Sequence, residues 1–142
     1  MDALMEAIAA RVKEMPGLEI PPRAFVAMGG EMQDYTPGVC LTVRFPVKSE
    51  YRNPFGFMQG GFILAAVDNT IGPLSMLVAE PSVTTHLNST FIRPVGPEES
   101  HITIVARLVE KTRKVLHMEA EVKNGNGKCC VRCMATFAIV ES

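Results

Sequence analysis

The sequence predicts an α+β fold in which an antiparallel β-sheet packs against one long α-helix. A single long apolar segment lies in the middle of the chain, from Gly60 to about Ala79, and has the length of a helix rather than a strand. Segments on both sides of it alternate apolar and polar residues with the period of two typical of strands. Strands and helices do not alternate along the chain, which argues against a parallel sheet of βαβ units. We therefore expect one domain that spans residues 1–142.

Three elements are expected before the long helix. Residues 2–15 form a short amphipathic helix, for which Asp2 is a plausible N-cap. A strand over residues 24–32 follows and leads into a loop through Asp34. The next strand, over residues 39–47, alternates regularly, as a half-buried strand does.

Four strands are expected after the long helix. Within this half of the chain, the Asn124-Gly125-Asn126-Gly127 run is a strong signal for the turn of a hairpin. The expected strands cover residues 82–93, 100–110, 115–123 and 128–140.

Composition limits the possible partners and the location. The formal net charge of −1 argues against nucleic acid, since binding of phosphates requires a basic surplus. Asp68 and Pro73 interrupt the central apolar segment, which argues against a membrane span, and residues 1–15 lack the apolar core of a signal peptide. We expect a soluble, cytoplasmic protein that uses neither membrane nor nucleic acid as a partner.

The cysteines have the spacing of a redox or metal motif but not its context. Cys130 and Cys133 form a C-x-x-C within an expected strand, where strict alternation places them on opposite faces. We interpret them as reduced cysteines with a packing role. The histidines are scattered, so the sequence predicts no metal site.

The start of the long helix is a candidate anion or oxyanion site. Gly60 and Gly61 open the helix, where backbone amides lack intrahelical partners and the helix dipole is positive. Two glycines also let a ligand approach the backbone closely. A tight turn without any binding role explains the same two residues equally well.

One carboxylate, Asp68, lies inside the apolar segment, and we expect it to be buried. A buried carboxylate is costly unless it is paired or used; local hydrogen bonds are the structural alternative to a functional role. Eight residues separate Asp68 from Gly60, or roughly 12 Å along a helix. Both groups can therefore serve one reaction only if they come from two chains whose helices run antiparallel across a dimer.

The chain resembles the hot-dog-fold acyl-CoA thioesterases, and within them the phenylacetate-pathway (PaaI-like) type. The resemblance covers roughly residues 39–140, and the spacing from the glycine pair to the aspartate is similar to that of the family. The residues that carry it are Asn53, Gly56, Gln59, Gly60, Gly61, Asp68, Asn69, Thr84, Asn88, Thr90, Phe91, Arg93 and Pro94.

The resemblance implies a sheet wrapped around the long helix, and dimers that usually pair into tetramers. It implies hydrolysis of a coenzyme A thioester, without metal or redox cofactor, at sites built from two chains. Gly60 would donate its amide to the thioester oxygen, and Asp68 of the partner chain would act as nucleophile or base. Asn53 would position water or the leaving sulfur, and Thr84 would hydrogen-bond in the same site.

Gln59 departs from the family pattern, in which a histidine usually precedes the glycine pair. A glutamine amide can donate a hydrogen bond to a carbonyl but cannot titrate, so Gln59 cannot supply acid–base chemistry. Gln59 could instead fix the turn, and Asn53 could be a turn residue before proline. His86 lies near Thr84 in sequence and is a weaker candidate for the site.

The remaining candidates would bind the substrate. Coenzyme A carries phosphates, for which Arg93, Arg113 and Lys114 are suitable partners, although a solvated turn explains the last two as well. Phe62 is a candidate for the acyl pocket or for the core, as are Phe55, Phe57 and Met58.

An acyl-CoA thioesterase is the function that the sequence favours. A non-catalytic module that binds acyl-CoA, as a sensor or carrier, is the alternative, and Gln59 favours it slightly. A hydratase or dehydratase acting on an acyl thioester is a third possibility, but that chemistry normally requires a histidine where Gln59 stands.

Overall fold

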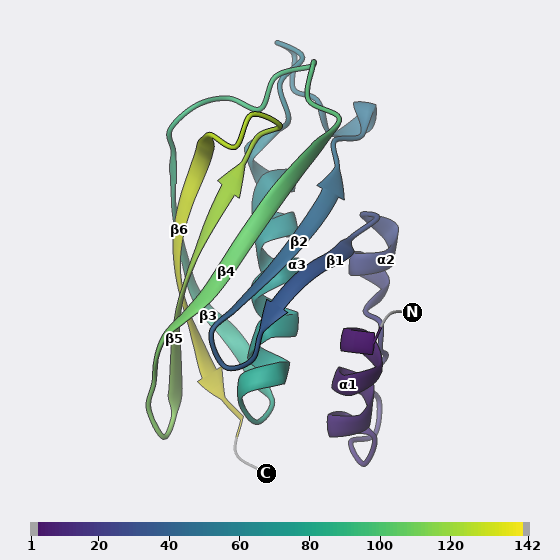
Figure 1. The fold of residues 1–142 in the computed structure, drawn as a ribbon, viewed down its shortest axis with the longest axis vertical. Helices are drawn as coiled ribbons and strands as arrows, with labels where there is room; N and C mark the ends of the chain where they lie inside the picture. The colour runs from purple at the N-terminus through teal and green to yellow at the C-terminus, as the bar shows by residue number, and fades with distance from the viewer. Residues whose placement is uncertain (1–2, 141–142) are drawn as a thin grey trace.

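A computed structural model describes residues 3–140 as a curved six-stranded sheet around one long helix, α3 (Figure 1). The sheet is antiparallel throughout, in the order β1-β2-β4-β5-β6-β3. Its strands are β1 (Glu31–Thr36), β2 (Cys40–Pro46), β3 (Ser82–Phe91), β4 (His101–Lys111), β5 (Val115–Lys123) and β6 (Cys129–Ile139). The helices are α1 (Ala3–Val12), α2 (Arg23–Ala27), the 3-10 turn η1 (Ser49–Tyr51) and α3 (Gly60–Val78). This arrangement confirms the predicted α+β fold.

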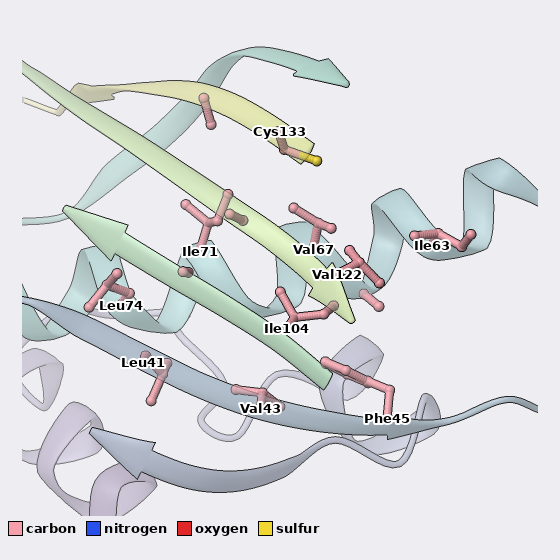
Figure 2. Close-up of a cluster of buried hydrophobic side chains, with 14 of the residues drawn as sticks. Leu41, Val43, Phe45, Ile63, Val67, Ile71, Leu74, Ile104, Val122 and Cys133 are labelled. Atoms are coloured by element: carbon pink, nitrogen blue, oxygen red, sulfur yellow. The ribbon is translucent and has the colours of Figure 1, made fainter. Parts of the chain in front are cut away.

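One side of α3 packs into the concave face of the sheet. Figure 2 shows Ile63, Val67, Ile71 and Leu74 pointing from the helix toward the strands, and all four are buried. Their partners on the strands are also buried and include Leu41, Val43, Phe45, Ile104 and Val122. By length and composition alone α3 would pass as a membrane span, but core helices pass the same test, and the buried side of α3 belongs to the core.

The other side of α3 is open, which corrects the expectation that Asp68 is buried. Asp68 and Gly61 are exposed, because the sheet of a single chain covers only one side of the helix. The helix continues through Pro73, which is buried. A helix can therefore be apolar on nearly all sides although the sheet of the same chain covers only one of them.

The prediction of a strand over residues 24–32 was wrong. The chain forms the short helix α2 there, and β1 begins only at Glu31, so Asp34 lies in a strand rather than in a loop. Phe25 and Met28 are both buried, and their spacing of three is that of a helix face rather than a strand. Alternation over so short a segment does not distinguish these two cases.

The N-terminal helix was predicted in the right place, although Asp2, its expected cap, lies outside the described residues. α1 packs on the C-terminal end of α3, and Met5, Ile8 and Val12 are its buried residues. Arg11 reaches the end of α3, where its guanidinium donates to the carbonyls of Leu77 (3.1 Å) and Ala79 (3.2 Å). α1 thus supplies a positive charge where the helix dipole is negative.

The cysteines are free thiols, but the predicted placement of Cys130 and Cys133 was wrong in one respect. Both are buried, since the pairing of β5 with β6 shifts register between Val122 and Lys123 and interrupts the alternation. Burial raises the pKa of both thiols. Raised pKa values keep them protonated and favour a packing role over redox chemistry.

Candidate active site

The N-terminus of α3 presents two backbone donors without partners among the described residues. Gln59 is the N-cap, and its carbonyl accepts the amides of Phe62 (3.0 Å) and Ile63 (3.2 Å). The amides of Gly60 and Gly61 precede the first intrahelical hydrogen bonds and remain free. The dipole of a 19-residue helix adds a positive potential at this point.

The loop before α3 is shaped by Asn53. Its side-chain Oδ1 accepts hydrogen bonds from the backbone amides of Phe55 (2.9 Å) and Phe57 (3.1 Å). The backbone amide of Asn53 donates to the Phe57 carbonyl (2.7 Å). Gly56 completes the turn with φ +83°, a conformation that favours glycine. Asn53 therefore has the turn-forming role that we considered as its structural alternative, and within the described chain its side-chain nitrogen makes no hydrogen bond.

A cleft of about 410 Å³ opens at the start of α3 and collects three of the predicted site residues. Asn53, Gly60 and Arg93 lie on its walls. The remaining lining is apolar and consists of Phe57, Met58, Ile63, Phe91, Ile92, Pro94 and Val95. A free amide beside an apolar cleft suits a ligand with a polar carbonyl next to an apolar group.

Phe91 closes one side of this cleft and was missed as a pocket residue by the sequence reasoning. A Cβ atom on Gly60 would lie 3.1 Å from Cζ and 3.2 Å from Cε1 of the Phe91 ring. The ring is half exposed although it lies against a helix terminus. Nothing local in the sequence indicates that the end of β3 returns to the start of α3, so the motif that contains Phe91 does not predict this proximity.

Asp68 lies elsewhere on the same helix, with Thr84 as its partner. The Thr84 hydroxyl donates to Asp68 Oδ1 at 3.0 Å, a contact between α3 and β3. Neither residue lines the cleft at Gly60. Because about 12 Å of helix separates Asp68 from Gly60, one chain brings Asn53, Gly60 and Arg93 together and holds Asp68 and Thr84 as a separate pair.

The other candidates at the start of α3 have different surroundings. Gln59 is exposed and its side chain makes no capping hydrogen bond. The Gly61 position is open, since a Cβ atom there would meet nothing within 4 Å. The Phe62 ring stacks on the buried Tyr51 with centroids 4.4 Å apart, so Phe62 packs beside the core and does not line the cleft.

Of the three predicted phosphate partners, only Arg93 lies at the cleft. Its guanidinium donates to the Cys129 carbonyl, which fixes the side chain against the start of β6. Arg113 and Lys114 lie in the turn after β4, whose last residue Lys111 contacts the C-terminal end of α3 through the Val78 carbonyl (3.4 Å). Within one chain these two residues are thus at the far end of the helix from Gly60.

His86 lies on β3, and its Nδ1 is 3.1 Å from the Thr136 hydroxyl. It does not line the cleft at Gly60. Among residues 3–140, no group of three histidine, cysteine or acidic side chains is arranged to hold a metal ion.

The sequence matches a protein family and proteins of other organisms. The family model of the thioesterase superfamily matches residues 55–131. A Saccharolobus solfataricus protein, named provisionally as an esterase, is 30% identical over 104 residues, which are 70% of this chain and 71% of its own.

Solved structures show the same fold. The Escherichia coli PaaI protein of the phenylacetic acid degradation operon superposes with a TM-score of 0.81 at 14% identity, covering 99% of this chain and 98% of its own. A Streptococcus pneumoniae thioesterase protein, solved with coenzyme A, gives a TM-score of 0.77 at 16% identity over 84% of this chain and 93% of its own. The long helix in a curved antiparallel sheet, together with the family match, shows that this chain belongs to the thioesterase superfamily, has the hot-dog fold and is a thioester hydrolase.

Proposed function

We propose that the protein hydrolyses acyl or aryl-acyl thioesters of coenzyme A to the free acid and the thiol. The free Gly60 amide at the edge of an apolar cleft is the observation that carries this proposal. A thioester places a carbonyl oxygen between an apolar acyl group and a polar thiol, and the cleft offers matching surroundings. Coenzyme A bound to a structural neighbour supports the choice of thiol, and Arg93 at the rim is a suitable partner for its phosphates.

The proposed site requires two chains. Asp68 and Thr84 are held together but stand apart from Gly60, and Asp68 lies on the exposed side of α3. The ten-residue strand β3 is an edge of the sheet and, among the described strands, pairs with β6 alone. A long unpaired edge is a liability that association removes. A homodimer with antiparallel α3 helices would cover both features, and we extend the proposal to a tetramer made of two such dimers.

The proposed reaction uses groups from both chains. The Gly60 amide donates to the thioester oxygen and stabilises the negative charge that develops there. Asp68 of the partner subunit either attacks the carbonyl carbon or removes a proton from the attacking water. Overall a C–O bond to the water oxygen forms, the C–S bond breaks, and the thiolate takes up a proton. Thr84 orients the carboxylate through its hydrogen bond.

Gln59 and Asn53 have supporting roles in this proposal. Gln59 is exposed beside Gly60, so its amide is available to hydrogen-bond a carbonyl or water. The Asn53 side-chain nitrogen makes no hydrogen bond among the described residues, while the side-chain oxygen holds the turn. The Gly61 amide is a second donor, while Arg113 and Lys114 would reach a substrate only from another chain. Hydrolysis by these groups needs no metal or redox cofactor, and we place the protein in the cytoplasm.

A thiol-release assay tests the proposal. Wild type and the Asp68→Asn and Asp68→Ala variants are assayed with short-chain, long-chain and aryl acyl-CoA substrates. We expect wild type to release thiol and both variants to lose at least about 100-fold in kcat. Asp34→Asn, at an exposed aspartate on β1, is the matched control and retains full activity.

Each outcome of this assay has a defined meaning. Absence of thiol release by wild type with every substrate contradicts the acyl-CoA proposal, and binding of acyl-CoA without turnover would favour a sensor or carrier. Equal rates in wild type and the Asp68 variants would contradict the catalytic role of Asp68 while leaving the activity in place.

A further inference from the structure

Phe91 occupies an unusual place for a half-exposed aromatic residue. It is the last residue of β3, and its ring edge lies so close to the first residue of α3 that a Cβ atom on Gly60 would be 3.1 Å from the ring. About half of the side chain is exposed, although apolar side chains at such a contact usually bury more of their surface. Phe91 lines the cleft together with Phe57 and Ile63.

The contact with Gly60 determines which part of a ligand meets this ring. A carbonyl oxygen bound to the Gly60 amide has its carbon within about 4 Å of that nitrogen. The two substituents of that carbon, the acyl group and the thiol, must then lie against the residues that flank Gly60. Phe91 flanks Gly60 on one side, and the cleft beyond it is lined by Ile63, Ile92 and Val95. The apolar substituent, the acyl group, matches this lining, whereas the amide-containing thiol does not.

We infer that Phe91 determines acyl specificity, by limiting the width of the acyl group at the carbons next to the thioester carbonyl. The inference rests on the proposed function, because it takes Gly60 as the oxyanion donor. The ring edge stands beside the first acyl carbons rather than at the far end of the chain. Straight-chain and arylacetyl groups, which are narrow at this point, pass the ring, while groups branched at the carbon next to the carbonyl meet it.

The test compares acyl-CoA substrates that differ only in branching, for example butanoyl-CoA against 2-methylpropanoyl-CoA. The ratio of kcat/KM for the straight substrate to that for the branched one is measured in wild type, Phe91→Leu and Phe91→Ala. We expect wild type to favour the straight substrate and the ratio to fall about tenfold in Phe91→Ala, with Phe91→Leu in between, which is the usual size of a one-methyl discrimination.

Met134→Ala is the matched control, since Met134 is an exposed apolar residue on β6 outside this cleft. We expect its ratio to equal that of wild type. An unchanged ratio in a folded Phe91→Ala variant overturns the inference, and if both activities fall by the same factor, Phe91 has a purely structural role. If Phe91→Ala does not fold, Phe91→Leu decides by the same ratio. Failure of wild type to hydrolyse any acyl-CoA instead contradicts the proposed function, so the two failures are distinguishable.

Discussion

At the scale of single residues, Gly60 combines two demands that only glycine meets without rearrangement. Its amide is a free donor at the helix start, and its Cα faces the ring of Phe91 so closely that a Cβ atom would require the ring to shift. Gly61, one position later, has open space where a Cβ atom would stand. The two adjacent glycines therefore differ in whether a side chain fits at their position. Substitutions at this site can thus distinguish a role in packing from a role in hydrogen bonding.

Replacing Gly60 by proline removes the N–H while keeping a helix-compatible backbone. Proline is favoured at the first position of a helix, and Gln59 already has the extended conformation that a following proline requires (φ −65°, ψ 138°). Gly60→Ala keeps the amide but adds the same contact with Phe91, so it is the control for crowding. We expect Gly60→Pro to lower kcat about 100-fold or more relative to Gly60→Ala, as for loss of one oxyanion donor. Equal kcat values in the two variants would contradict the donor role.

At the scale of elements, α3 is held at its C-terminal end by two cations from different parts of the chain. Arg11 of α1 donates to two of its last carbonyls, and Lys111 of β4 reaches the Val78 carbonyl and Glu80. A backbone hydrogen bond and, to a smaller extent, the charge of Lys111 lower the pKa of Glu80. The C-terminal end of α3, which lies opposite the cleft, is therefore fixed by these contacts. The hydrogen bonds of Arg11 also attach α1 to α3.

Arg11→Ala tests this attachment. The variant loses two charge-assisted hydrogen bonds to the end of α3, and we expect the free energy of unfolding to fall by about 1 kcal/mol, measured by urea denaturation. Arg23→Ala is the matched control, because its ion pair with Glu19 is largely exposed, and should cost at most about 0.5 kcal/mol. Equal losses in the two variants would show that Arg11 does not hold α1 on α3.

The elements with long, regular patterns were predictable, and those made by tertiary contacts were not. The bounds of α3 were predicted because Gly60 and Gly61 open an apolar run of helical length, and each of the strands after it is nine residues or longer. α2 was mistaken for a strand because five residues carry too little periodicity. Its helical conformation instead reflects the burial of Phe25 and Met28 against the rest of the core.

The sequence predicted which residues belong to the candidate site, but not how the single chain arranges and covers them. The distance along α3 already separated Asp68 from Gly60, and the structure keeps them apart within one chain. The exposure of Asp68 was not predictable, since an apolar pattern does not reveal how much of a helix its own sheet covers. Phe91 reaches Gly60 only because β3, at the edge of the sheet, ends beside the start of α3. Such a contact between distant segments leaves no local signal.

At the scale of the whole molecule, the single chain leaves two kinds of surface without a partner. The exposed side of α3 carries Asp68, and the edge strand β3 carries exposed apolar surface outside the cleft, as at Val83. Both surfaces belong to elements that also bear proposed site residues. Association of two chains would thus complete the sheet and the site together, which is the central claim of the proposed mechanism.

Complementation between two inactive variants tests this claim most directly. Asp68→Asn and Gly60→Pro chains, carrying different affinity tags, are co-expressed and the mixed dimers are isolated with both tags. If each site combines Gly60 of one chain with Asp68 of the other, a mixed dimer has one site with both substitutions and one with neither. We expect mixed dimers to recover about half of the wild-type activity per dimer, while each variant alone remains inactive. Mixed dimers as inactive as the parent variants, or variants that remain monomeric together with an active monomeric wild type, would contradict the two-chain site.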